Sequence, residues 1–381
     1  MSGDPIFRFA VIGDVSRNNK SCMAGVSHVL TRLRKLGVRS VLFAEEREWR
    51  LVDVEEKGKS FDLGAAAVAA LEEKRPAIEY VERGGFGFVL CNEKGLSEKA
   101  WTPFAEKMME RLKRAKVFFY AQIYHPAGTV AGDFVPKQDG GFSTAALSGM
   151  RNCVAFSVGA RGPLSDERSI RQGDFGFTSV ATSSFRYPEL FPGRDAAPEP
   201  AKPSRTRPAL IVSVHGDRVE FSRMLLAAGE KLGDDWVMPF GDYGALSYER
   251  RARAMPAPEF AEGAKAQVRF VREKTAEGED RDLVKVEFPR AQGTRAFEYE
   301  VTAHCLDGGV DAVVSQKRVY SPGVFLQPGA EPAKVSCPFA RKELYQDVQL
   351  MFEVRAMNCF GAKGRPITCV RTVKSGMRKE G

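Results

Sequence analysis

The sequence predicts an α/β domain followed by an all-β domain. Early in the chain, apolar runs with the length of buried strands alternate with stretches of helical spacing. From about Pro256 the pattern changes to short strand-like runs separated by turn residues, which is typical of a two-sheet sandwich. With 381 residues, 43% of them hydrophobic, the chain is long enough to bury the cores of two or three domains.

The first elements predict a parallel sheet covered by helices. Phe7–Ile12 is an apolar run that ends at Gly13-Asp14, and Val38–Ala44 is a second such run. Between them apolar residues recur at helical spacing and Gly37 stands where a helix should stop; these residues are Met23, Val26, Leu30 and Leu33. Leu63–Lys74 is rich in alanine and predicts a further helix. Alternating strands and helices favour a parallel sheet.

The middle of the chain continues in the same way. Gly84–Phe88 is too short for a dinucleotide loop and predicts a hairpin turn. Ser97 can cap a helix with one apolar face, formed by Trp101, Phe104, Met108 and Leu112. A strand over Val117–Tyr124 follows, then strands between Cys153 and Thr182, a proline-rich loop over 193–208, a hairpin around His215-Gly216-Asp217 and a short strand containing Trp236.

The last part of the chain contains six strand-like runs, at 266–273, 283–289, 296–306, 313–321, 333–339 and 350–361. We therefore expect a first domain over 1–250, a β-sandwich over 251–372 and a basic tail over 373–381.

Composition limits the partners and the compartment. The net charge of +8 comes from 57 basic and 49 acidic residues that are interspersed, which suits anionic ligands but does not favour nucleic acid. Seven cysteines without a Cys-x-x-Cys pair argue against a disulfide framework or a zinc site, and most are expected to be buried. No apolar run is long enough to cross a membrane, and no secretory signal opens the sequence, so we expect a cytoplasmic protein without a membrane partner.

The segment VAFSVGARGPLSDERSIRQGDFGFTSVATSS, residues 154–184, resembles the last metal-binding segment of the calcineurin-like metallophosphoesterases. In one branch of that family a strand ends in Gly-His-x-His and is followed by a PL-DERSI-QG run. The matching positions are Phe156, Ser157, Pro163, Leu164, Asp166, Glu167, Arg168, Ser169, Ile170, Gln172 and Gly173.

This resemblance implies a four-layer α/β/β/α sandwich followed by an immunoglobulin-like sandwich of fibronectin type III kind. It also implies a phosphoric ester hydrolase with two divalent metals about 3.5–4 Å apart, bound at the ends of strands.

Few of the family's metal ligands are present. Asp14 matches the first aspartate, but Ser16 stands in place of the following histidine, and Glu46 falls on the Gly-Asp position. The Gly-Asn-His segment has no counterpart. The single family histidine matches His125, while Gly159 and Arg161 replace the final pair. Of the four histidines in the chain only His125 lies at a ligand position, so the candidate metal ligands are Asp14, Glu46 and His125.

Two functions remain open. In the first, the chain is a pseudo-phosphoesterase with no catalytic residue and no cofactor, which binds a phosphorylated or other anionic ligand, or a protein partner through its second domain. In the second, it is an active hydrolase with a remodelled site for Mn, Fe or Zn. For the first, Arg17, Arg161 and Arg168 are candidate anion-binding residues. The alternative is that Asp166, Glu167 and Arg168 form ion pairs that brace the strand ends.

Overall fold

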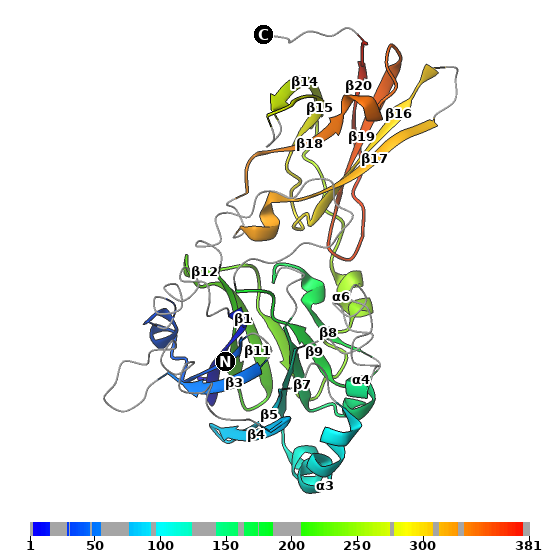
Figure 1. Cartoon of the computed structure of the whole chain (residues 1–381). Helices are drawn as coiled ribbons and strands as arrows, with labels where there is room; N and C mark the ends of the chain where they lie inside the picture. Colours follow the sequence, from blue (N-terminus) through cyan, green and yellow to red (C-terminus); the bar gives the residue numbers. More distant parts are fainter. Residues whose placement is uncertain are drawn as a thin grey trace. The chain divides into compact units, whose positions relative to one another are not determined.

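The computed structural model has a mixed α/β fold made mostly of strands (Figure 1). It describes residues 3–15, 29, 31–45, 48–54, 76–92, 97–123, 142–158, 164–173, 175–185, 207–274, 278–307, 312–326 and 331–375. Contacts divide the chain into two compact units, and the division after the first domain falls between Arg251 and Ala252. Three expectations lie wholly or largely outside the described residues: the helix over Leu63–Lys74, the loop over 193–208 and the basic tail.

The first sheet of the first unit is mixed, so the prediction of a parallel sheet is confirmed for β1 and β2 but is wrong for the sheet as a whole. β1 is parallel to β2, but it is antiparallel to β10, and β2 is antiparallel to β3. Consecutive strands joined by short links cannot run parallel, because a parallel pair needs a long crossover. The strand order is β12-β11-β10-β1-β2-β3, with β13 also paired to β11. The bounds are β1 (Phe7–Val15), β2 (Ser40–Glu45), β3 (Glu48–Asp53), β10 (Pro208–Val214), β11 (Arg218–Leu225), β12 (Glu230–Lys231) and β13 (Trp236–Pro239).

The second sheet keeps the predicted parallel core. Its order is β4-β5-β6-β7-β9-β8, in which β5, β6, β7 and β9 are parallel and the edge strands β4 and β8 are antiparallel to their neighbours. Gly84 and Gly85 turn β4 into β5 with φ of 58° and 83°, which confirms the hairpin. The bounds are β4 (Ile78–Arg83), β5 (Phe86–Cys91), β6 (Phe118–Gln122), β7 (Cys153–Ser157), β8 (Ile170–Gln172) and β9 (Thr178–Ala181).

The two sheets of this unit share one apolar core. Phe9 of β1 is fully buried, and its ring lies 5.1 Å from that of Phe88 and 4.8 Å from that of Phe119. Alternate residues of β1 point the other way, where Ala10 and Ile12 pack with other buried residues of a second cluster. Those residues include Val29 and Leu33, part of the predicted first helix, of which residues 31–35 are described as helical before Gly37 ends the segment with φ of 70°.

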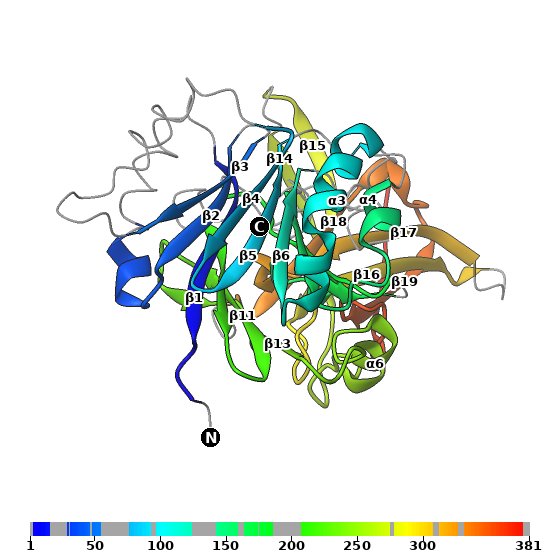
Figure 2. The same cartoon turned by 90° about the horizontal axis from the view of Figure 1, so that it is seen from below.

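Helices α3 (Glu98–Arg114) and α4 (Phe142–Leu147) cover the outer face of the second sheet (Figure 2). The predicted cap is confirmed, since the Ser97 hydroxyl accepts a hydrogen bond from the backbone N–H of Ala100. Trp101 and Leu112 of the predicted apolar face are buried against this sheet. A further short helix, α6 (Tyr248–Ala254), follows, and the division between the two units falls within it, after Arg251.

In the second unit all six predicted runs form strands. Together with a seventh strand that lies outside these runs, β20, they make two antiparallel sheets, β14-β15-β18 and β17-β16-β19-β20. The sheets share a core in which the rings of Phe339 and Phe352 lie 5.8 Å apart. The bounds are β14 (Gln267–Lys274), β15 (Asp280–Pro289), β16 (Glu298–Cys305), β17 (Ala312–Tyr320), β18 (Lys334–Ala340), β19 (Gln349–Met357) and β20 (Ile367–Thr372).

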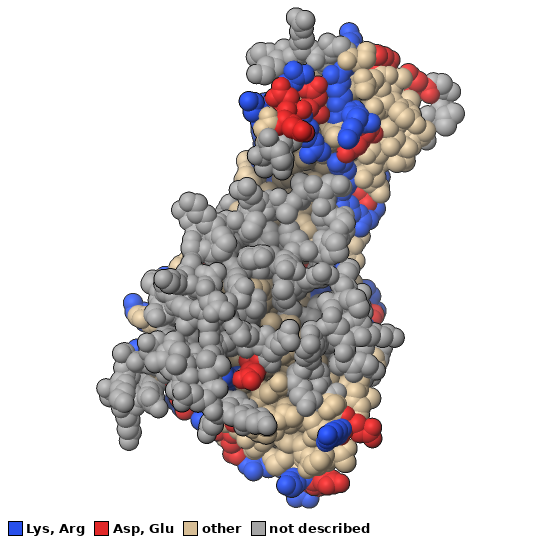
Figure 3. All heavy atoms as spheres, in the orientation of Figure 1, with Lys and Arg blue, Asp and Glu red and all other residues tan. Residues whose placement is uncertain are grey.

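Two expectations about composition are met in the described part of the chain. Basic and acidic side chains adjoin one another on the surface (Figure 3). The described cysteines are free thiols, and all except the partly buried Cys369 are buried. None of the described helices has the length and apolar character needed to cross a bilayer.

Candidate functional site at the carboxyl end of β1

The predicted site residues are only partly described. Asp14 lies in β1, directly after the tightly packed Gly13 and within the register shift of the β1–β2 pairing between Ile12 and Val15. Arg168 is the middle residue of a short 3₁₀ turn, η1 (Glu167–Ser169). Arg17, Glu46, His125 and Arg161 lie outside the described residues, so their roles as ligands stay predictions.

Arg168 is held by a buried carboxylate. Its Nε lies 3.0 Å from Oδ1 of Asp166 and its Nη2 lies 2.8 Å from Oδ2, while its backbone N–H donates to the same carboxylate at 2.9 Å. Asp166 is buried, and a buried carboxylate needs such a partner because desolvation of its charge is costly. This contact is the bracing ion pair of the alternative interpretation, and Arg168 as an anion ligand stays a prediction.

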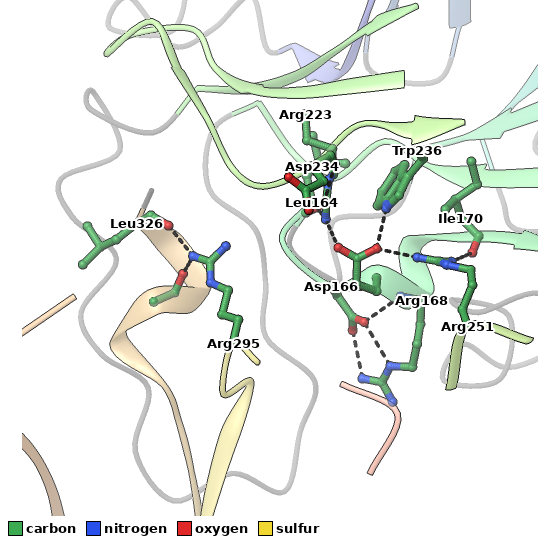
Figure 4. Close-up of polar contacts among 12 residues, drawn as sticks. Leu164, Asp166, Arg168, Ile170, Arg223, Asp234, Trp236, Arg251, Arg295 and Leu326 are labelled. Carbon is green, nitrogen blue, oxygen red and sulfur yellow. Dashed lines mark hydrogen bonds and ion pairs between the residues drawn. The ribbon is translucent and has the colours of Figure 1, made fainter. Parts of the chain in front are cut away.

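Glu167 forms a second and larger network. Oε1 of Glu167 lies 2.6 Å from Nη1 of Arg223, while Oε2 accepts from Nη2 of Arg251 at 2.5 Å and from Nε1 of Trp236 at 2.6 Å. Figure 4 shows these three donors from β11, α6 and β13 pointing at one carboxylate. The DERSI run therefore ties three separate elements of the first unit together.

Arg223 is buried in a strand that otherwise buries apolar residues. It is 2% exposed, its guanidinium lies 4.5 Å from the ring centroid of Trp236, and it also donates to the backbone carbonyls of Leu164 and Asp234. Its role was not predicted from the sequence. The strand pattern could have indicated its burial, because Arg223 stands at an inward position of the alternation, together with Val219, Phe221 and Leu225.

The end of β1 is packed tightly against a polar segment. A Cβ added to Gly13 would lie 2.3 Å from the carbonyl oxygen of Ser183 and 2.5 Å from Oγ1 of Thr182, so only glycine fits there. The backbone N–H of Phe185 donates to the carbonyl of Gly13 at 2.9 Å, and Thr182 Oγ1 donates to the carbonyl of Ser157. The residue before Asp14 is thus clamped by the segment 182–185 at the carboxyl ends of β7 and β9.

The backbone is strained at two positions of this edge. Ser183 has φ of 60° and Arg207 has φ of 40°, in the left-handed region that disfavours residues with a side chain. Both are buried, and Oγ of Ser183 has no hydrogen-bond partner among the residues that the structure describes. Such strain is kept where the surrounding structure forces it, and it is common at functional sites. Nothing in the sequence marks these two residues.

Arg207 brings a fixed positive charge to this edge. It directly precedes β10, whose antiparallel register with β1 runs from Phe7↔Val214 to Val11↔Leu210, so Arg207 lies at the end of the sheet where β1 presents Asp14. Its guanidinium lies 5.2 Å from the ring centroid of Phe185. Together with Thr182, Ser183 and Ser184, Arg207 defines the described part of the candidate site, which we call the β1 edge.

The described side chains that define the β1 edge are hydroxyls and a guanidinium, which are not the usual ligands of a two-metal centre. Hydroxyls of serine and threonine are weak, neutral ligands, and a guanidinium stays protonated and repels cations. No group of three or more His, Cys, Asp or Glu side chains suited to a metal ion occurs within the described ranges. The same donors are hydrogen-bond donors for an anion.

Comparison with protein-family models and with curated proteins gave no match for this chain.

Proposed function

We propose that the chain is a pseudo-phosphoesterase that binds a phosphate-bearing or other anionic ligand at the β1 edge without metal catalysis. In this proposal the first unit is the four-layer α/β/β/α sandwich of the calcineurin-like metallophosphoesterases, and the second unit is a fibronectin type III-like sandwich suited to contact a protein partner.

The arrangement of the first unit supports the proposed fold. Its two sheets face each other across one core, and the outer faces pack on α3 and α4 and on the helical residues around Leu33. Gly13 and Asp14 lie in the last three residues of β1, and Asp14 stands where the family's first metal ligand belongs.

The observation that carries the proposed function is the buried Arg207 at this edge. In the family, metal ions supply the positive charge that attracts a phosphate. A guanidinium can supply the same charge without a metal and can donate two parallel hydrogen bonds to phosphate oxygens. The unpartnered hydroxyl of Ser183 adds a further donor at the same edge. Ser16, Gly159 and Arg161 replace histidines that bind the metals in the family. These replacements remove nitrogen ligands but leave the positive charge of Arg207.

The test measures metal content, hydrolysis and anion binding on one preparation. Protein purified without chelator should contain no stoichiometric Mn, Fe or Zn and should not hydrolyse bis-p-nitrophenyl phosphate with added Mn²⁺. Phosphate should bind, as measured by calorimetry, and Arg207→Met should weaken that binding by about tenfold or more. The matched control is Arg250→Met, since Arg250 is an exposed arginine paired with Asp242.

The alternative hydrolase gives a different result. Stoichiometric metal that is lost in His125→Ala, together with Mn²⁺-dependent turnover, would establish a remodelled site at Asp14, Glu46 and His125 and would refute the proposal. Equal phosphate affinity in Arg207→Met and the parent protein would refute the role of the β1 edge.

A further inference from the structure

A separate hollow of about 530 Å³ lies between the end of α3 and the β4–β5 hairpin. It is lined by Phe86 and Phe118, the first residues of β5 and β6, whereas the β1 edge lies where the parallel strands β7 and β9 end. The hollow therefore lies at the amino ends of the parallel strands, and the β1 edge lies at their carboxyl ends. Its volume is within the range of small-molecule sites, about 300–1,000 Å³.

The apolar floor of the hollow is formed by two half-buried aromatic side chains, Tyr80 and Phe86. Leu112, Val117 and Phe118 lie beneath them and are fully buried. Gly87 allows the Tyr80 ring to pack directly on β5, since a Cβ there would lie 2.7 Å from the tyrosine hydroxyl oxygen. Tyr80 and Phe86 therefore supply the aromatic surface that a ligand can reach.

The rim of the hollow is basic. Lys107, Arg111 and Arg114 follow one face of α3 over two turns, since they are four and three residues apart, and Lys116 follows the helix. Two acidic residues, Glu82 and Glu110, also line the space. The lining therefore has four basic and two acidic side chains, an excess of positive charge.

The basic side chains differ in how they are held. Arg111 pairs with Glu82, and its guanidinium lies 5.1 Å from the ring centroid of Tyr80. Lys116 donates to the carbonyl of Gly216 and lies 5.1 Å from the ring centroid of Phe240. The side chain of Arg114 is 84% exposed, and its Nη2 lies 3.9 Å from Oε2 of Glu110, which is too far for a hydrogen bond. Lys107, the first basic residue of the row along α3, is also exposed. Arg114 and Lys107 are therefore the charges best able to turn to an incoming anion.

We propose that this hollow binds a small organic anion. An aromatic or aliphatic body lies on the floor formed by Tyr80 and Phe86, and the anionic group lies against the row of Lys107, Arg111 and Arg114. Neither feature alone selects the ligand: an inorganic anion leaves the apolar floor exposed, and an uncharged apolar molecule leaves the basic row unused. This site is independent of the β1 edge and of any phosphoesterase activity.

The experiment uses naphthalene-1-sulfonate, which has an aromatic body and a single charge that no phosphoesterase can remove. Binding to the full chain is measured by calorimetry at fixed ionic strength, with sodium sulfate in place of the probe as the charge-only comparison. The site variant is Lys107→Glu with Arg114→Glu. The matched control is Lys99→Glu with Lys113→Glu, which makes the same change in net charge on exposed positions of α3 that do not line the hollow.

The control also tests whether the basic residues of the row serve only to stabilise helix α3. Cations in the last turn of a helix stabilise it through the helix dipole, and Lys113 would share this role with Arg114. Circular dichroism shows whether each variant keeps its helix. We expect the probe to bind one site, the site variant to weaken binding by about tenfold or more, and the control to change it by less than about twofold. Sulfate should bind at least about tenfold more weakly than the probe.

Any of three results would overturn the proposal: no binding to the parent protein, equal weakening in both double variants, or unchanged binding in both. Equal affinity for sulfate and the probe would also contradict it, because the apolar floor would then contribute nothing. None of these outcomes depends on the phosphate binding or hydrolysis tests at the β1 edge.

Discussion

Arg223 of β11 reaches Glu167 in the turn before β8, with 2.6 Å between Nη1 and Oε1, although the two residues are far apart in the sequence. The arginine is buried, while the carboxylate also accepts from Arg251 and Trp236. The DERSI run is thus anchored in the core of the first unit, and its first two acidic residues each hold an arginine: Asp166 holds Arg168, and Glu167 holds Arg223.

Replacing Arg223 with leucine should destabilise the first unit by about 2–4 kcal/mol. Removal of one partner leaves a carboxylate uncompensated in a largely buried place, and the loss is below the full range for buried pairs because Arg251 remains. Urea unfolding followed by tryptophan fluorescence measures this, since Trp49, Trp101 and Trp236, the three tryptophans of the chain, all lie in the first unit. The control is Arg250→Leu, which removes the exposed ion pair with Asp242 and should change stability by at most about 1 kcal/mol. Equal effects of the two variants would contradict the anchoring role.

Phe9→Ala should cost the first unit about 3–5 kcal/mol, because Phe9 of the first sheet is fully buried and its ring packs on Phe88 and Phe119 of the second sheet. Ile6→Ala, next to the same strand but 58% exposed, should change stability by less than about 0.5 kcal/mol. The same fluorescence assay applies. A small effect of Phe9→Ala would show that the two sheets do not share one core.

Gly13→Ala should destabilise the first unit by about 1–3 kcal/mol, since the new Cβ meets a backbone oxygen that cannot move without shifting the segment 182–185. Gly241→Ala is the control because its Cβ would meet nothing within 4 Å. If the β1 edge binds phosphate as proposed, Gly13→Ala should also weaken phosphate binding measured by calorimetry. An alanine variant as stable as the parent would show that the clamp on Gly13 is loose.

The second unit should lose stability in acid through Glu300. Burial raises the pKa of Glu300, but hydrogen bonds from Lys363 and Arg318 lower it more, so its net pKa is below the ordinary value. The carboxylate lies 2.6 Å from Nζ of Lys363 and 3.0 Å from Nη2 of Arg318. A lowered folded-state pKa means that its stabilisation is complete above the unfolded-state pKa of about 4.3 and is lost as the pH falls through the folded-state value.

Glu300→Gln should therefore reduce the dependence of the second unit's stability on pH below about 4.5 and lower its stability near neutral pH. Urea unfolding followed by circular dichroism between acid and neutral pH measures both effects. The exposed Glu273, which pairs with Lys285, gives the control Glu273→Gln. Identical pH profiles for Glu300→Gln and the parent protein would contradict this assignment.

Much of the fold could be predicted from local features. Ser97 caps α3 because its hydroxyl accepts from a nearby N–H, and Gly84-Gly85 makes a hairpin because glycine tolerates positive φ. The direction of β10 against β1 could not be predicted in this way. These strands are joined only by the long intervening sequence, and periodicity describes one strand without naming its partner.

The sequence by itself determined where many of the described strands and helix α3 lie, the hairpin at Gly84-Gly85, and the scarcity of histidine donors, because these depend on the type and spacing of neighbouring residues. Only the tertiary structure decided that Glu167 meets Arg223, that Ser183 and Arg207 are strained beside Gly13, and that Tyr80, Phe86 and the basic residues of α3 line one hollow. Each of these features joins residues that are distant in sequence, and such meetings arise only when the packing of whole sheets brings them together.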